Sequence, residues 1–189
     1  LVDGLRRLEY RGYDSAGVAI LEGGEIAVRR AKGKLINLEG TLRERPLQGH
    51  LGIGHTRWAT HGKPSEKNAH PHRAGHVVIV HNGIIENYRA LRSELEGRGA
   101  EIQSDTDSEL IAHLIDERVG EGKDLLTAVR ESCGDLVGSY ALAAICDQDP
   151  GLLVTAKNGG SPIIIGQGDK QSFLASDIPA VLPYTREII

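Results

Sequence analysis

The 189-residue sequence has no methionine and is poor in cysteine and in aromatic residues. Its two cysteines, Cys133 and Cys146, lie among ordinary apolar neighbours, which predicts buried free thiols and fits the reducing cytoplasm. No apolar run approaches membrane-spanning length, and no signal-peptide pattern occurs. The net charge of −4, with basic residues scattered along the chain, gives no electrostatic footprint for nucleic acid. These absences favour a cytoplasmic protein that binds neither membranes nor nucleic acids.

The lack of methionine also bears on the two ends of the chain. Val2, Leu5 and Leu8 follow the spacing of a helix from the very first residues, and the chain stops at Ile188 and Ile189, partway into an apolar run. The length is typical of one domain. We therefore expect residues 1–189 to form a single domain that is truncated at both ends.

Two polar clusters lie in the segment 53–87, and each follows an apolar run. The run Val77–Val80 is typical of a strand buried on both faces, and Asn82-Gly83 follows it closely. A strand that ends there would present a side-chain amide and a free backbone N–H at one point, with Gly83 able to take a positive φ. Such donors stabilise a developing oxyanion. The alternative interpretation is a simple Asn-Gly turn.

Two charged residues are candidates for binding a small amino acid. Arg57, beside Trp58, offers a guanidinium fork for a carboxylate, although a surface stacking pair is the commoner interpretation. Thr106 and Glu109 have the spacing of a capping box before the helix expected over 110–119, which places Asp107 in its first turn. From the residues alone, Asp107 is better explained as a helix-start carboxylate than as the partner of a bound ammonium.

A metal-dependent hydrolase is a weaker alternative. Seven of the eight histidines lie between His50 and His81, and histidine is the commonest metal ligand. However, the sequence has no HExxH pattern, and the segment 53–87 is poor in carboxylates. His76 and His81 should also point to opposite faces of the strand between them. We therefore expect no metal site.

The secondary structure expected from periodicity and turn signals is mixed. Tight turns between strands imply antiparallel pairing, and helices occur in blocks, which predicts an α+β fold with two sheets face to face and helices outside. The segment 62–76 shows no period and is expected to be a long loop. Strands are expected over 16–21, 25–30, 52–56, 77–80, 139–146, 152–156, 162–165 and 172–175, and helices over 1–10, 36–43, 84–98, 110–119, 124–132 and 178–182.

Five motifs resemble one enzyme family. They are LEYRGYDSAG at 8–17, HTRWATHG at 55–62, NAHPH at 68–72, HNGIIEN at 81–87 and SDTDSE at 104–109. In this order, and over nearly the whole chain, they resemble the N-terminal glutaminase domain of glucosamine-6-phosphate synthases, which are class II glutamine amidotransferases. Amidophosphoribosyltransferases share the general pattern, but Tyr13 and Trp58 resemble the hexosamine enzymes more closely.

The resemblance implies a fold and an activity. The fold is the four-layer αββα fold of N-terminal-nucleophile hydrolases. A cysteine at the mature N-terminus, with its own α-amino group as base, hydrolyses the side-chain amide of L-glutamine without a cofactor. The ammonia passes to a C-terminal sugar-phosphate isomerase domain, which makes glucosamine 6-phosphate from fructose 6-phosphate. We expect the full-length enzyme to be a homo-oligomer.

The resemblance also assigns residues. Asn82 and the N–H of Gly83 correspond to the oxyanion hole, Arg57 to the clamp on the glutamine carboxylate, and Asp107 to the acceptor of its ammonium. The remaining assignments are Thr60 and His61 in the glutamine-binding loop, Trp58 at the gate of the ammonia path, and Arg11 and Gly12 beside the nucleophile.

The nucleophile is where the sequence departs from the family pattern. Neither Cys133 nor Cys146 matches the family cysteine, and Leu1 aligns inside the helix that follows it. The chain as given is therefore expected to be inactive by itself. A non-catalytic module that binds glutamine is the alternative to a piece of an active enzyme.

Overall fold

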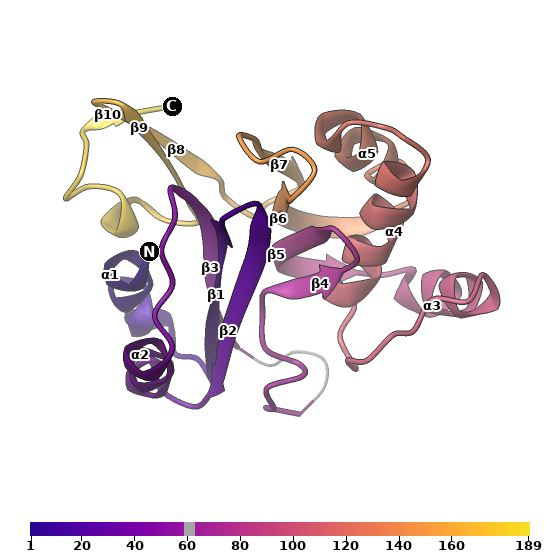
Figure 1. Ribbon diagram of the computed structural model, residues 1–189, viewed down its shortest axis with the longest axis horizontal. Coiled ribbons are helices and arrows are strands. Elements are labelled where there is room, and N and C mark those ends of the chain that lie inside the picture. The colour runs from indigo at the N-terminus through magenta and orange to yellow at the C-terminus, as the bar shows by residue number, and fades with distance from the viewer. Residues whose placement is uncertain (59–62) are drawn as a thin grey trace.

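The first sheet is built around a hairpin that the sequence predicts. The structure, a computed structural model, describes residues 1–58 and 63–189 (Figure 1). Gly23 and Gly24 have φ angles of 61° and 90°, which suit the tight turn of the hairpin. All pairs in this sheet are antiparallel, with the strand order β2-β1-β3, where β1 is Ser15–Glu22, β2 is Glu25–Lys32 and β3 is Leu51–Arg57.

The second sheet differs from the sequence expectation in two places. Its strand order is β4-β5-β6-β7, again antiparallel, with β4 over His72–Ala74, β5 over Val77–Ile85, β6 over Gly138–Cys146 and β7 over Leu153–Asn158. The expected loop over 62–76 therefore contains a strand, whose short length hides any alternating pattern. Strand β5 also continues past Val80 and through Asn82-Gly83 instead of ending there, because β6 pairs with it as far as Ile85.

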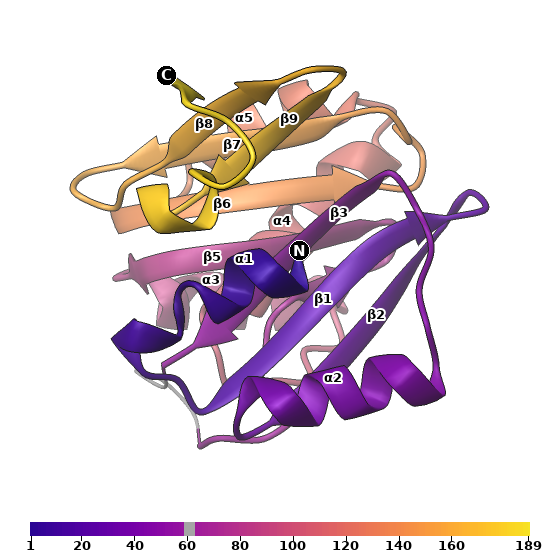
Figure 2. The same ribbon diagram turned by 90° about the vertical axis from the view of Figure 1, so that its left-hand side faces the viewer.

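Helices cover the outer face of each sheet (Figures 1 and 2). Leu5, Leu35 and Leu38 pack against Ala16 and Val18 of the first sheet, and a larger apolar cluster joins the second sheet to its helices. The first group is α1 (Val2–Arg6), the 3-10 turn η1 (Glu9–Arg11) and α2 (Leu35–Glu44); the second is α3 (Tyr88–Gly97), α4 (Ser108–Gly120) and α5 (Leu125–Ser132). The helix expected over 1–10 is shorter, because α1 ends before η1 begins. The helix expected over 84–98 is also shorter, because its first residues belong to β5.

A separate core lies between the two sheets. Ile26 and Ile53 of the first sheet belong to the same buried cluster as Val78 and Ile145 of the second. The sheets therefore face each other, and their helices lie outside, as Figure 1 shows. This arrangement confirms the predicted α+β class with antiparallel sheets.

The C-terminal part forms a small third sheet. Its strand order is β10-β8-β9, with β8 over Ile164–Gly168, β9 over Gln171–Ala175 and β10 over Glu187–Ile188. Strand β8 begins two residues later than expected, and a 3-10 turn η2 (Ile178–Ala180) replaces the expected helix over 178–182. None of the helices in the described ranges has the length and apolar character needed to cross a bilayer.

Candidate active site

A cavity of about 680 Å³ lies where α1, β3, β5, β6 and β9 meet. Seven of the nine residues that the resemblance assigns fall within the described ranges, and all seven line this cavity. They come from four distant stretches of the sequence: Arg11, Gly12, Arg57, Trp58, Asn82, Gly83 and Asp107. The other two, Thr60 and His61, lie outside the described residues.

Asn82 and Gly83 reach the cavity from inside a strand. Gly83 has a φ of 131° and pairs with Tyr140 of β6, and a Cβ there would lie 2.1 Å from the backbone oxygen of Ser139. A residue with a side chain therefore cannot fit at this position, which is strained for any L residue as well. The preceding Asn82 is half-buried, and its Oδ1 lies 2.8 Å from Nε2 of His55.

Arg57 is the last residue of β3 and is buried, with 4% of its surface exposed. Its Nη1 lies 3.6 Å from Oδ1 of Asp14, and the backbone N–H of Asp14 donates to the Arg57 carbonyl at 2.8 Å. A guanidinium at this depth needs anionic partners, because burying a charge without one is costly. The site therefore holds a permanent positive charge against one wall.

Asp107 lies directly before α4 and is 5% exposed. Its Oδ2 accepts from the backbone N–H of Ile85 at 2.8 Å, which ties the start of α4 to the end of β5. Asp107 is the N-cap residue of α4. The sequence predicts it one residue later, in the first turn of the helix. Asp107 contributes a buried carboxylate to the same cavity as Arg57.

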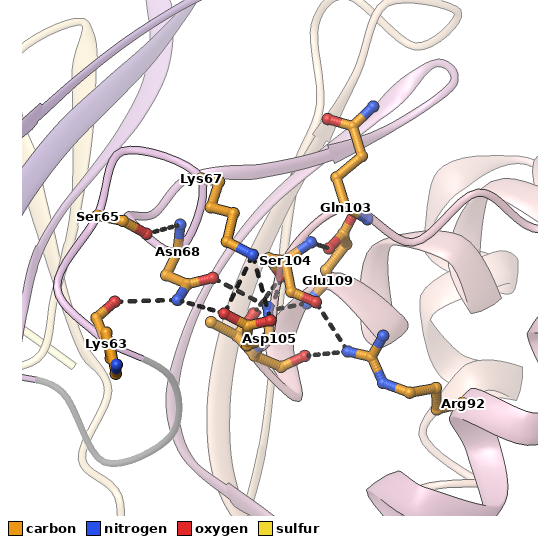
Figure 3. Close-up of polar contacts among 10 residues, drawn as sticks. Lys63, Ser65, Lys67, Asn68, Arg92, Gln103, Ser104, Asp105 and Glu109 are labelled. Carbon is orange, nitrogen blue, oxygen red and sulfur yellow. Dashed lines mark hydrogen bonds and ion pairs between the residues drawn. The ribbon is translucent and has the colours of Figure 1, made fainter.

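The predicted capping box is half formed. Thr106 Oγ1 accepts from the Glu109 backbone N–H at 3.4 Å, as in a capping box. The Glu109 carboxylate instead accepts from the backbone N–H groups of Gln103, at 2.9 Å, and Ser104 (Figure 3). Burial alone would raise the pKa of Glu109, but the His113 ring, 3.8 Å away, and hydrogen bonds from Ser104 and Gln103 outweigh it and lower the pKa to about 2.

Arg11, Gly12 and Trp58 meet at one side of the cavity. Gly12 has a φ of 73°, and a Cβ there would lie 2.2 Å from the ring of Trp58, which is 66% exposed. The Arg11 guanidinium extends to the C-terminal segment, where it donates to Ser176 Oγ at 3.0 Å and pairs with Asp177 at 2.7 Å. The glycine thus makes room for the indole ring.

A buried group of histidines is the part of the site that sequence reasoning missed. The rings of His55 and His70 are 4.2 Å apart, and those of His70 and His72 are 4.7 Å apart. His81 is buried too, with its Nδ1 2.8 Å from Ser108 Oγ. The NAHPH motif gave a signal, but its segment was expected to be an irregular loop, so nothing placed its rings against β3 and β5.

Burial governs the charge of this group. It is the main reason that the pKa of His55 is lowered to about 4 and that of His72 to about 3, and neighbouring histidines and Arg57 act in the same direction. Burial also places the pKa of His70 well below its usual value. These rings are therefore neutral at pH 7. Within residues 1–58 and 63–189, no three His, Cys, Asp or Glu side chains are grouped as a metal site requires.

Neither cysteine belongs to the site. Cys133 follows α5 and Cys146 ends β6, and neither lines the cavity in the described part of the chain. Both thiols are free, as predicted, but only Cys146 is buried, whereas Cys133 is half-buried. Burial raises the pKa of the Cys146 thiol, which makes it a poorer nucleophile.

The family of the chain follows from comparison with known proteins. A family model described as a glutamine amidotransferase domain matches residues 55–183, about two thirds of the chain, including the end of β3 and all of β5 and α4. The chain belongs to the glutamine amidotransferase domain family. The matched range contains the cavity residues Arg57, Asn82 and Asp107.

Similar curated proteins narrow the resemblance. The amidotransferase domain is 54% identical, over its whole length, to glutamine–fructose-6-phosphate aminotransferase [isomerizing] of Clostridium perfringens (strain 13 / Type A). It is 53% identical to the enzyme with the same name from Mesorhizobium japonicum. In both cases the chain spans 31% of the relative's length.

Solved structures show the same fold at lower identity. Glutamine phosphoribosylpyrophosphate amidotransferase from B. subtilis, complexed with ADP and GMP, matches 97% of this chain with a TM-score of 0.82 and 26% identity. A structure described as the allosteric regulatory enzyme of purine biosynthesis matches it with a TM-score of 0.83, also at 26% identity. In each case 40% of the solved chain is covered.

Proposed function

We propose that this chain is the glutaminase domain of a glutamine–fructose-6-phosphate aminotransferase, which supplies ammonia for the synthesis of glucosamine 6-phosphate. The observation that carries the proposal is the meeting of Arg57, Asp107, Asn82 and Gly83 around one cavity. The chain is layered as helices, two sheets and helices, and this order supports the four-layer αββα fold of N-terminal-nucleophile hydrolases.

Glutamine has two charges at one end and a neutral amide at the other, and the cavity has complementary groups. The α-carboxylate would bind the Arg57 guanidinium, and the α-ammonium would bind the Asp107 carboxylate. The amide carbonyl would then lie against the Asn82 side chain and the Gly83 N–H, and both would donate hydrogen bonds to the carbonyl oxygen as it becomes negative. Thr60 and His61 are assigned to the same glutamine loop by resemblance alone.

We propose that the nucleophile is a cysteine thiol, and neither Cys133 nor Cys146 lines the cavity in the described part of the chain. The thiol would give its proton to its own α-amino group, and the thiolate would attack the amide carbon. The same proton would pass to the amide nitrogen, which leaves as ammonia, and water would hydrolyse the remaining thioester to glutamate. Arg11 and Gly12 are proposed to flank this thiol, and Trp58, beside Gly12, to gate the ammonia path. A C-terminal sugar-phosphate isomerase domain would receive the ammonia in a homo-oligomeric enzyme.

Two alternatives differ in what the cavity does. An amidophosphoribosyltransferase would deliver ammonia to a different acceptor, but the identity to the solved enzyme of that name is 26%, against 54% to the aminotransferase. A non-catalytic module would bind glutamine without cleaving it. Restoring a nucleophile separates this alternative from the enzyme.

The binding test uses L-glutamine titrated into the 189-residue chain by calorimetry. Loss of one partner of a desolvated charge pair costs roughly 2–5 kcal/mol, so Arg57→Ala should weaken binding about 30-fold or more. Arg57→Lys keeps the charge beside Asp14 but loses the fork, and should weaken binding less. Arg89→Ala, on exposed α3, should bind normally. Unchanged affinity in Arg57→Ala would remove the basis of the proposal.

The catalytic test measures glutamate release. The chain by itself should release none, and Cys133→Ser and Cys146→Ser should change nothing. A chain extended upstream to begin with the family cysteine should release glutamate and ammonia. Binding without hydrolysis in the extended chain would favour the non-catalytic module.

A further inference from the structure

One hydrogen bond at the site joins the two sheets. His55 lies on β3, where it pairs with Gly17, and Asn82 lies on β5, where it pairs with Ala141. Their side chains meet across the space between the sheets, with His55 Nε2 2.8 Å from Asn82 Oδ1. Both residues line the cavity.

The orientation of the Asn82 amide decides what it can do there. An asparagine amide has one oxygen that only accepts and one NH₂ group that only donates. If the oxygen is held by His55, the NH₂ group is left for the cavity. If the amide is flipped, its oxygen would face any developing negative charge and repel it.

The surroundings of His55 select one orientation. The ring is neutral at pH 7 because burial lowers its pKa to about 4, so it carries a single N–H. Its Nδ1 has no hydrogen-bond partner among the described residues, whereas its Nε2 faces the Asn82 oxygen. A proton on Nδ1 would lie unpaired and would set the bare lone pair of Nε2 against the Asn82 oxygen, whereas a proton on Nε2 is paired with that oxygen and leaves only an unpaired acceptor at Nδ1. The proton therefore belongs on Nε2.

We propose that His55 is a positioning residue, which donates from Nε2–H to Asn82 Oδ1 and so fixes the Asn82 NH₂ group as an oxyanion donor. This inference rests on the proposed glutaminase function. His70, whose ring lies 4.2 Å from that of His55, has no hydrogen bond through either nitrogen within the described ranges. It acts only as a packing surface behind His55.

The inference is tested by glutaminase kinetics of the full-length aminotransferase that carries this chain. His55→Leu should lower kcat for glutamine hydrolysis about tenfold or more, but less than the 10²–10³ expected for loss of the donor itself. KM for glutamine should change little. His55→Gln, which can donate from its amide to the same oxygen, should recover much of kcat. His70→Leu, which removes a neighbouring ring but no hydrogen bond, should cost less than His55→Leu.

A double mutant separates positioning from general damage. In an Asn82→Ala background there is no amide left to orient, so adding His55→Leu should lower kcat no more than about twofold. A full additional loss in that background would show that His55 acts structurally, and it would overturn the inference. Normal kcat in His55→Leu, with KM raised in Arg57→Ala, would overturn the inference while the proposed function stands.

A measurement without activity reports the tautomer. The ¹⁵N NMR spectrum of the imidazole of His55 in the 189-residue chain at pH 7 should show a protonated Nε2 and a bare Nδ1. A proton on Nδ1 would overturn the inference, whatever the kinetics. If neither Arg57→Ala nor Asn82→Ala affects glutamine turnover, the proposed function fails, and the positioning role fails with it.

Discussion

At the residue scale, the roles proposed for the site residues separate binding from chemistry. Arg57 and Asp107 are buried charges whose partners hold them in place, Asp14 for one and the Ile85 N–H for the other. Asn82 is the neutral residue of the three, and its amide oxygen is already engaged in a hydrogen bond with His55. Substitutions of the charges should therefore act on KM, and substitutions of the amide on kcat.

Asn82→Ala is the residue-scale prediction. The proposed role is to donate to a charge that develops only in the transition state, so its loss should lower kcat for glutamine hydrolysis about 10²–10³-fold in the full-length enzyme. KM should change little, because the ground-state carbonyl needs the donor less. Steady-state glutamate release checks this, with Asn37→Ala, at an exposed position of α2, as the control. A kcat within a few-fold of the parent would leave Asn82 as a strand residue with no catalytic part.

At the element scale, one buried asparagine joins the segment before β4 to the segment before α4 (Figure 3). Asn68 is fully buried, and its Nδ2 donates to the Lys63 carbonyl at 2.9 Å and to Asp105 Oδ2 at 3.1 Å. Its Oδ1 accepts from the Asp105 backbone N–H at 2.9 Å. The Asn68 amide thus supplies hydrogen bonds to backbone groups that lie outside any helix or strand. One of them belongs to Asp105, two residues before Asp107.

Asn68→Ala should destabilise the chain by about 1–3 kcal/mol, because it leaves a part-buried backbone N–H and a part-buried carbonyl unpaired. Lys67→Ala is the matched control, since the Lys67–Asp105 ion pair is about half exposed on both sides and should contribute under about 1 kcal/mol. Urea unfolding at pH 7, followed by circular dichroism, measures both. Equal midpoints for the two variants would mean that solvent replaces the hydrogen bonds of Asn68.

The elements also show how far the sequence could be taken. The Gly23–Gly24 hairpin and α5, with Asp124 capping it through the Thr127 N–H, follow from local signals and were predicted. Strand β4 and the extension of β5 through Gly83 depend on pairing with distant strands, which local periodicity does not contain. The buried group of histidines was missed for the same reason, because it also depends on which distant segments lie side by side.

The site residues, like the elements, divide into those that the sequence could predict and those that it could not. Arg57, Asn82 and Asp107 stand in motifs whose order is recognisable, and the structure brings them to one cavity. Their chemical roles stay predictions. The contact of His55 with Asn82 could not be predicted, because it requires knowing which faces of β3 and β5 meet.

At the scale of the whole molecule, the space between the sheets is apolar at one end and polar at the other. Ile53, Val78 and Ile145 fill the apolar end, where the sheets pack directly. At the other end, His55 and His70 lie beside the cavity, while His72 and His81 are buried on the opposite face of the second sheet, where they contact Thr106 and Ser108 next to α4. A fold that buries imidazoles in this way must keep them neutral, so its stability depends on pH.

The sign of this dependence follows from the lowered pKa values. The unfolded chain takes up protons on its histidines below about pH 6.5, whereas folded His55 and His72 resist until about pH 4 and pH 3. Their contribution is thus fully present above pH 6.5 and is lost as pH falls towards the folded values. At pH 5 each should have lost about 2 kcal/mol relative to pH 7.5. Glu109 adds its own loss only below about pH 4.5, so measurements down to pH 5 isolate the histidines.

Urea unfolding between pH 7.5 and pH 5 should therefore show the free energy of unfolding falling steeply as pH decreases. His70→Leu removes one buried imidazole and leaves no new polar group unpaired, so its profile should be flatter than that of the parent. His50→Gln, at an exposed position, should reproduce the parent profile and controls for the loss of a histidine as such. If the His70→Leu profile is as steep as the parent's, protonation of the buried histidines is not what weakens the fold. The charge that destabilises it at low pH would then have to come from elsewhere in the molecule.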